Sequence, residues 1–198
     1  MTNLAVAVDE TMNSQAFLNW LGEKEEKYEL IEGVPVVKAS AKGRHARAIS
    51  NLHFHLRLAL RGKPCEVLME SILFRTDYQT TDKNALLPDL FLLCKGKHLP
   101  LNENNMQGGP TMAIEVLSPS TLRRDKIYKF NKYLDAGVAE YWIVDPARLM
   151  IDVNVLRDSG YMTRSYSLGD TVTLTVAEEV SVSVDDIFEG LSVDEDEN

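Results

Sequence analysis

The spacing of hydrophobic positions alternates along the chain between a helical period and a strand period. In residues 14–26, Phe17 and Leu21 recur at helical spacing. The next segment, YELIEGVPVVK, instead has the character of two short strands joined by a turn at Glu32-Gly33. The beginning of the chain is therefore predicted to form a helix followed by a β-hairpin.

A second helix is predicted from Gly43 to about Gly62. Its hydrophobic positions lie on one face of an amphipathic helix: Ile49, Leu52, Leu56 and Ala59. His45 lies on the same face, four residues before Ile49. The segment Gly62-Lys63-Pro64 ends the pattern.

Three apolar segments in the middle of the chain, CEVLMESILF, LLPDLFLLC and TMAIEVL, are typical of strands. A helix is predicted after the third, from about Thr121 to Ala136, with Ile127, Phe130 and Leu134 facing inward. The apolar strand AEYWIVDP follows it. This order of strand, helix and strand predicts a parallel crossover at the centre of a sheet.

The last part of the chain is predicted to add antiparallel strands. Its segments IDVNVLRD, GYMTRSYSL and DTVTLTV are separated by turn residues such as Asp158-Ser159-Gly160. With 198 residues and 44% hydrophobic content, the chain is long enough for one substantial core. We expect a single domain over residues 1–191 and a disordered acidic tail over residues 192–198.

Composition adds expectations about the surroundings of the protein. Cys65 and Cys94 lie in separate apolar segments, without CxxC spacing or a nearby His, so neither a zinc site nor a disulfide is expected. The first ten residues lack a basic region and a long apolar region, and no segment approaches the roughly 20 apolar residues that span a bilayer. We expect a cytoplasmic protein in a reducing compartment, with no membrane contact.

The net charge of -9 is distributed unevenly. Beyond Arg164 there is no Lys or Arg, whereas ten of the 30 acidic residues lie there. Residues 1–164 therefore carry 21 basic against 20 acidic residues, and residues 33–75 carry eight against two. A nucleic-acid partner is compatible with this distribution, and so is a solvated basic helix face.

Two acidic residues stand out because they lie inside apolar strand segments. Asp89 follows Pro88 in LLPDLFLLC, and Glu115 lies in TMAIEVL. If the strands are neighbours, two carboxylates about 4 Å apart repel by roughly 4 kcal/mol at an effective dielectric constant near 20. Mg²⁺ or Mn²⁺ would convert that repulsion into binding. The alternative is that Asp89 is a turn residue and that Glu115 pairs with a surface arginine.

Longer motifs resemble the Uma-two family of endonucleases, within the PD-(D/E)XK restriction-endonuclease-like superfamily. The resemblance covers most of residues 14–190 and rests on YELIEG, LLPDLF, AIEVLSPST and RRDKIYKFNKYLDAGVAEYWIVDP. It implies an α/β fold with a restriction-endonuclease-like core, in which helices flank a mixed central β-sheet and additional antiparallel strands lie at the N- and C-terminal ends.

The resemblance also implies a metal site. Asp89 matches the aspartate of the PD motif, and Glu115 matches the second acidic residue, so both resemble ligands of a catalytic Mg²⁺. The carbonyl of Val116 is a further candidate ligand. Glu29 in YELIEG matches an acidic residue that the superfamily places near the N-terminus, and Glu32 is the alternative, because strand alternation lets only one of the two point into the site.

The lysine of the superfamily pattern is displaced. It usually follows two residues after the second acid, but that position is Leu117. In the Uma-two family the lysine comes from the following helix, and the D-x-x-x-K spacing of Asp125 and Lys129 matches that arrangement. Lys126 is the second candidate, since it lies closer to the apolar face of an α-helix. His45 occupies the position of a family histidine, and a hydrogen-bonded core histidine is the alternative.

These residues imply a metal-dependent endonuclease that hydrolyses phosphodiester bonds of DNA, with basic residues between positions 38 and 61 contacting backbone phosphates. A homodimer is expected, because relatives that cut both strands commonly pair. The alternative is a non-catalytic nucleic-acid-binding or assembly module that retains the fold. The sequence contains no GxSxG, P-loop or HExxH motif that would indicate another class of hydrolase.

Overall fold

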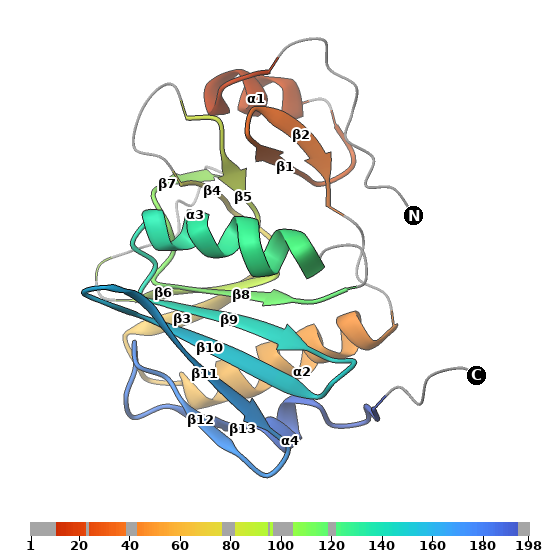
Figure 1. Ribbon diagram of the computed structural model, residues 1–198, viewed down its shortest axis with the longest axis vertical. Helices are drawn as coiled ribbons and strands as arrows, with labels where there is room; N and C mark the ends of the chain where they lie inside the picture. Colours follow the sequence, from red (N-terminus) through yellow and green to blue (C-terminus); the bar gives the residue numbers. More distant parts are fainter. Residues whose placement is uncertain are drawn as a thin grey trace.

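Two β-sheets with a helical segment between them form the body of the protein (Figure 1). The computed structural model describes residues 11–22, 24–38, 43–76, 82–94, 96, 105–118 and 122–193. The helical segment that ends in α3 lies between the sheets, and α2 lies on the opposite face of the larger sheet (Figure 1). The architecture is the mixed α/β fold that the sequence predicted.

The larger sheet has six strands in the order β11-β10-β9-β8-β6-β3. Its strands are β3 (Cys65–Met69), β6 (Leu90–Cys94), β8 (Met112–Val116), β9 (Glu140–Asp145), β10 (Met150–Arg157) and β11 (Gly160–Ser167). Strands β8 and β9 pair in parallel, while the other neighbours are antiparallel. The predicted parallel crossover is confirmed, and the two strands that it joins lie in the middle of the sheet.

The smaller sheet has five strands in the order β2-β1-β5-β4-β7. Its strands are β1 (Tyr28–Ile31), β2 (Val34–Val37), β4 (Leu73–Arg75), β5 (Ala85–Leu86) and β7 (Asn105–Gln107). The predicted hairpin of β1 and β2 is confirmed. Its turn residues Glu32 and Gly33 both have positive φ angles, of 50° and 83°, as a two-residue type I′ turn requires.

Two predicted strands are divided between the two sheets. In LLPDLFLLC, Leu86 belongs to β5 of the smaller sheet and Leu90–Cys94 form β6 of the larger one. The segment CEVLMESILF forms β3 in the larger sheet and β4 in the smaller one, so the prediction of a single strand was wrong. The chain leaves the larger sheet at Glu70, whose backbone N–H donates to the carbonyl of Asp89 (3.2 Å). Periodicity alone could not show this division, because both halves are equally apolar.

The C-terminal strands are also paired differently from the prediction. Strands β10 and β11 form the expected hairpin, but β12 (Thr171–Thr173) pairs with β13 (Ser181–Ser183) in a separate two-stranded sheet. A short helix, α4 (Val184–Ile187), follows. Of the predicted disordered tail, residues 194–198 lie outside the described residues.

Two helices cover the outer faces of the sheets. Helix α1 (Ser14–Leu21) packs against β1 through Phe17, and helix α2 (Gly43–Ala59) packs on the larger sheet. Ala48, Leu52 and Leu56 of α2 are fully buried against the face of that sheet that carries Ile114 and Trp142. Burial of each of the two leucine side chains stabilises the fold by about 1.5–3 kcal/mol. No helix in the described ranges is long and apolar enough to cross a membrane.

The helical segment between the sheets begins with a π-helix, η1 (Arg124–Lys129), and continues as α3 (Phe130–Asp135). The wider π turn changes which side chains face inward. Asp125 and Lys129 are buried, whereas Ile127, which was predicted to face inward, is 58% exposed. That prediction was wrong because it assumed 3.6 residues per turn over a segment that is not α-helical.

A disulfide links Cys65 of β3 and Cys94 of β6. The two residues are direct partners in the antiparallel ladder, with Cα atoms 4.2 Å apart. The expectation that neither cysteine forms a disulfide was therefore wrong. It considered each cysteine in its own segment, and only the pairing of the strands brings them together.

Reduction of this disulfide is expected to lower the free energy of unfolding by about 3–4 kcal/mol, because the bond closes a loop with a sequence separation of 29 residues. Denaturant titrations with and without dithiothreitol measure the difference. The double variant Cys65→Ser/Cys94→Ser serves as the control and should not respond to the reductant. Equal stability of the oxidised and reduced wild-type chain would contradict the expectation.

Candidate active site

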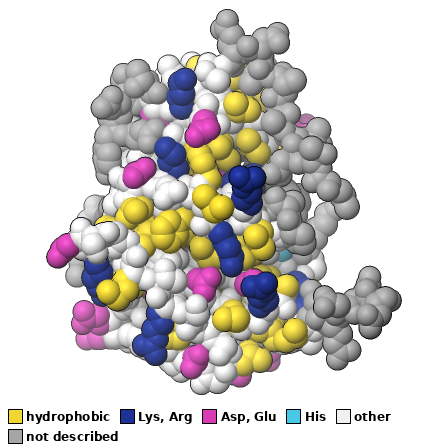
Figure 2. Space-filling model, viewed as in Figure 1, with side chains coloured by type: hydrophobic (Ala, Val, Ile, Leu, Met, Phe, Trp, Pro, Cys, Tyr) yellow, Lys and Arg dark blue, Asp and Glu magenta, His cyan; other side chains and the backbone are white. Residues whose placement is uncertain are grey.

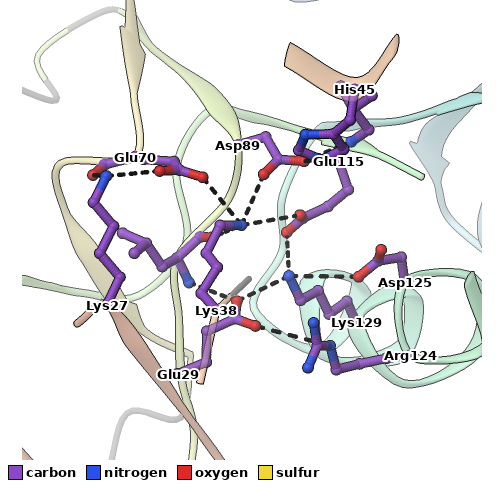
Figure 3. A network of polar contacts seen from close by, with 12 residues as sticks. Lys27, Glu29, Lys38, His45, Glu70, Asp89, Glu115, Arg124, Asp125 and Lys129 are labelled. Atoms are coloured by element: carbon purple, nitrogen blue, oxygen red, sulfur yellow. Dashed lines mark hydrogen bonds and ion pairs between the residues drawn. The ribbon is translucent and has the colours of Figure 1, made fainter. Parts of the chain in front are cut away.

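A cluster of buried charged side chains lies where the two sheets, η1 and the start of α2 meet (Figure 3). Asp89 directly precedes β6, and Glu115 lies in β8, the neighbour of β6 in the larger sheet. Their side chains are only 3% and 2% exposed. Asp89 lies in a bend just before its strand and not within it, but β6 and β8 are adjacent, as the sequence argument required.

Asp89 is held by one backbone and two side-chain contacts. Its Oδ2 accepts a hydrogen bond from the backbone N–H of Val116 (2.7 Å) and lies 3.3 Å from Nε2 of His45. Its Oδ1 lies 2.8 Å from Nζ of Lys38. These contacts fix both oxygens, so Asp89 belongs to the buried cluster, although it lies in a bend as the alternative of a turn residue had it.

Glu115 lies on the face of β8 that η1 and α3 cover. Its Oε1 is 2.7 Å from Nζ of Lys129 and accepts a hydrogen bond from the hydroxyl of Tyr133 (2.9 Å). Its Oε2 is 3.8 Å from Nζ of Lys38. The partners of Glu115 are therefore buried groups, and the alternative of a surface arginine does not apply.

The N-terminal hairpin contributes Glu29, which is fully buried. Its Oε1 accepts the backbone N–H of Leu87 (2.9 Å) and lies 2.8 Å from Nζ of Lys129. Its Oε2 is 3.9 Å from Nε of Arg124 and has no hydrogen-bond partner among the described residues. Glu32, the alternative acid, is exposed in the hairpin turn and lies outside the cluster.

The π-helix brings Lys129 into the cluster. Its side chain is 1% exposed, and its ammonium contacts Glu29, Glu115 and, at 3.5 Å, Asp125 on the same helical segment. Lys126 points elsewhere: its side chain is 33% exposed and lies 3.8 Å from Asp152. Leu117, at the usual position of the superfamily lysine, packs instead in an apolar cluster that includes Tyr133.

The charges in the cluster shift one another's ionisation. Burial raises the pKa of the Glu115 carboxyl above its ordinary value, although Lys129 and Lys38 act in the opposite direction. Burial also acts to raise the pKa of Asp89, but Lys38 and His45 outweigh it, so that this pKa is lowered. Burial would lower the pKa of Lys129, yet the surrounding carboxylates raise it above its usual range. Asp89 and Lys129 therefore remain charged at neutral pH.

Sequence reasoning missed the part that Lys38 plays. It was counted among the basic residues that would contact backbone phosphates, but its side chain is only 8% exposed and points into the cluster (Figure 3). The ammonium lies 2.8 Å from both Asp89 Oδ1 and the carbonyl of Leu87. The one available signal was its position at the end of the strand that pairs with Glu29.

His45 lies in the first turn of α2 and contacts the cluster through one ring nitrogen. Its Nε2 faces Asp89, whereas its Nδ1 is buried with no hydrogen-bond partner among the described residues. Burial acts to lower the pKa of His45, but the contact with Asp89 raises it overall. The histidine therefore belongs to the cluster through its contact with Asp89.

Comparison with known proteins identifies the family. A profile of the Uma2 family, described as "putative restriction endonuclease", matches residues 14–186. The chain belongs to the Uma2 family. This is the Uma-two family that the motifs resembled, and membership places the chain among restriction-endonuclease-like nucleases.

Two individual proteins are similar to this chain over most of its length. An uncharacterized protein from Synechocystis sp. is 24% identical over 185 residues, which cover 91% of this chain and 93% of the relative. The crystal structure of a "putative nuclease" of the DUF820 family from Anabaena variabilis is similar with a TM-score of 0.72 and 21% identity. It covers 89% of this chain and 97% of that one, which shows a common fold.

The cluster of buried charged side chains has the ligand chemistry of a Mg²⁺ or Mn²⁺ site. Asp89 and Glu115 both approach one positively charged group, the ammonium of Lys38, with oxygens of the kind that hard cations prefer. No group of three or more His, Cys, Asp or Glu side chains in the described ranges is arranged to hold a metal ion. Mg²⁺ is usually bound by one or two carboxylates and keeps several waters, so two carboxylates suit it.

Proposed function

We propose that this Uma2 protein is a metal-dependent endonuclease that hydrolyses phosphodiester bonds of DNA. The observation that carries the proposal is the convergence of Asp89, Glu115 and Lys129 from three separate parts of the chain. Burying several carboxylates and lysines together is costly in free energy, and clusters of this kind are concentrated at functional sites. The family assignment supports nuclease chemistry at this cluster.

In this proposal Asp89, Glu115 and the carbonyl of Val116 hold the metal ion. When bound, Mg²⁺ or Mn²⁺ supplies Lewis-acid polarisation of the phosphate and lowers the pKa of a bound water. The backbone N–H of Val116 orients Asp89, since it donates to the carboxylate oxygen that does not contact Lys38.

The remaining residues position these groups and stabilise charge. Lys129 holds Glu29 and Glu115 in place and stabilises the negative charge that develops on the phosphate during hydrolysis. Tyr133 fixes the Glu115 oxygen that Lys129 contacts. Glu29, whose Oε2 has no hydrogen-bond partner among the described residues, is proposed to orient a water, and His45 holds Asp89 from the side of α2.

Contacts to the DNA backbone are assigned to basic residues outside the cluster. Arg47, Arg57 and Arg61 are exposed on or just after α2. Figure 2 shows Lys and Arg side chains spread over one face among hydrophobic and acidic ones. Such scattered contacts add affinity with little sequence preference. A homodimer remains part of the proposal. The Cys65–Cys94 disulfide removes the argument from a reducing compartment on which the cytoplasmic location rested.

The proposal is tested by incubating the purified protein with supercoiled plasmid and with linear DNA in the presence of Mg²⁺, Mn²⁺ or EDTA. Nicking or linearisation of the plasmid with either metal, and none with EDTA, is the expected result. Salt-sensitive DNA retention without cleavage under any divalent cation would instead favour the non-catalytic nucleic-acid-binding module. A parallel incubation with RNA measures the preference between the two polymers.

A further inference from the structure

Lys38 lies between the two carboxylates that the proposed function assigns to the metal. Its Nζ is 2.8 Å from Oδ1 of Asp89 and 3.8 Å from Oε2 of Glu115. It also contacts the carbonyl of Leu87 at 2.8 Å. A positively charged group of the chain thus already occupies the position to which the two carboxylates point (Figure 3).

An ammonium and a metal ion cannot share this position. Mg²⁺ binds carboxylate oxygens at 2.0–2.1 Å and retains its own waters. The Lys38 ammonium, 2.8 Å from Asp89 Oδ1 and 3.8 Å from Glu115 Oε2, fills the space near both oxygens that a metal ion bound to them would need. The two cations would also repel each other, since a low effective dielectric constant strengthens the interaction of close charges. Binding of one therefore requires displacement of the other.

We propose that Lys38 is a built-in competitor of the metal ion, which neutralises Asp89 and Glu115 in the metal-free protein and leaves when a divalent cation binds. The inference rests on the proposed function in one respect, that the metal binds at these two carboxylates. It goes further by assigning to Lys38 the control of metal affinity.

The structure provides a second partner for the displaced side chain. Glu70 Oε1 is 3.8 Å from Lys38 Nζ, and the Glu70 side chain is 21% exposed, so it lies on the solvent side of the cluster. Glu70 Oε2 is held by Lys27 at 2.6 Å. Lys38 directly follows β2, and rotation of its four-carbon side chain can carry the ammonium towards Glu70 without a change in the backbone.

The first experiment compares Mn²⁺ binding by the wild-type chain and the variant Lys38→Met, measured by electron paramagnetic resonance of free Mn²⁺. Methionine keeps the length of the side chain but removes the charge. We expect binding by the variant to be at least about tenfold tighter, because the unneutralised carboxylates repel each other until the metal binds. Lys27→Met is the matched control. It removes the same charge from the other partner of Glu70, and its affinity should remain within about twofold of wild type, as screened surface charges contribute little.

Affinity of Lys38→Met equal to or weaker than that of wild type would overturn the inference. A failure of this inference can be distinguished from a failure of the proposed function, because the first is measured by metal binding and the second by DNA cleavage. Tighter binding without DNA cleavage by either chain would support the inference and reject the endonuclease, whereas metal-dependent cleavage by wild type without tighter binding by the variant would do the opposite. Absence of Mn²⁺ binding in all three chains at millimolar concentration would reject both.

A second measurement uses the unaltered chain and does not depend on the folding of a variant. Lysine acetylation is followed by mass spectrometry with and without Mg²⁺. The 8% exposed side chain of Lys38 should react slowly without metal and several-fold faster with it, while Lys27, whose side chain is 53% exposed, should react equally in both. Protection of Lys38 that is unchanged at saturating Mg²⁺ would show that the ammonium stays in place and would overturn the proposal.

Discussion

Replacing Asp89 with Asn is expected to reduce DNA cleavage by about 10³-fold or more while leaving the chain folded. A bound metal contributes several kcal/mol of charge stabilisation in the transition state, and each 1.4 kcal/mol corresponds to a factor of ten in rate. The amide oxygen of Asn can still accept the N–H of Val116, but the negative charge that the metal requires is lost. Single-turnover cleavage of a labelled duplex measures the change.

The control for this variant is Asp152→Asn. Asp152 is a partly exposed residue of β10 that accepts a hydrogen bond from Ser165 and lies 3.8 Å from Lys126, outside the cluster. The DNA cleavage rate of Asp152→Asn should remain within about threefold of wild type, because surface substitutions usually change stability little. Circular dichroism and thermal unfolding of both variants establish that they are folded. Undiminished cleavage by folded Asp89→Asn would reject the assignment of the metal site.

Replacing Lys129 with Met is expected to destabilise the protein by about 3–5 kcal/mol. The change leaves Glu29 and Glu115 buried without their closest cation, and removal of one partner from a buried ion pair carries a penalty of this size. For a chain of 198 residues the melting temperature should fall by roughly 10 °C. Differential scanning calorimetry and urea titration provide the measurement.

The neighbouring lysine is the matched control. Lys126→Met removes the same charge from the same helical segment, but the Lys126 side chain is partly exposed and its ion pair with Asp152 is long at 3.8 Å. Lys126→Met should lower the free energy of unfolding by less than about 1 kcal/mol. The double variant Glu115→Gln/Lys129→Met should recover part of the stability lost in Lys129→Met, since one unpaired carboxylate is removed with the lysine. Equal destabilisation by the two lysine substitutions would contradict the structure.

Both predictions depend on the burial of opposite charges beside one another in the cluster. Glu29, Asp89 and Glu115 form the acidic part, and Lys38 and Lys129 neutralise them. An apolar core of similar volume would avoid the desolvation of these groups, so the cluster is not explained by stability alone. Such a cluster fits the chemical role that we propose, in which a charged site is prepared before the substrate binds.

Several elements could be predicted from local sequence. The turn of the β1-β2 hairpin follows from Glu32-Gly33 between two apolar segments, and the crossover from β8 to β9 follows from strand, helix and strand signals in order. The pattern of α2 predicted its buried face. In each case the signals lie in consecutive segments of the chain, where periodicity and turn residues can be recognised.

Other features could not be predicted in this way. The inward position assigned to Ile127 was wrong because a π-helix replaces the expected α-helix, and no local pattern indicates that change. The disulfide of Cys65 and Cys94 depends on the register of two strands that are not consecutive in sequence. The division of CEVLMESILF depends on which sheet each half can join.

The sequence by itself determined the order of the elements, the family resemblance and the identity of the acidic candidates, because these depend on neighbouring residues and on motifs. Only the tertiary structure decided which lysine enters the cluster, that Glu29 joins it, and that Lys38 lies between Asp89 and Glu115. The physical reason is that buried charges are arranged by contacts between distant segments. The free energy of each charge depends on partners that sequence proximity does not reveal.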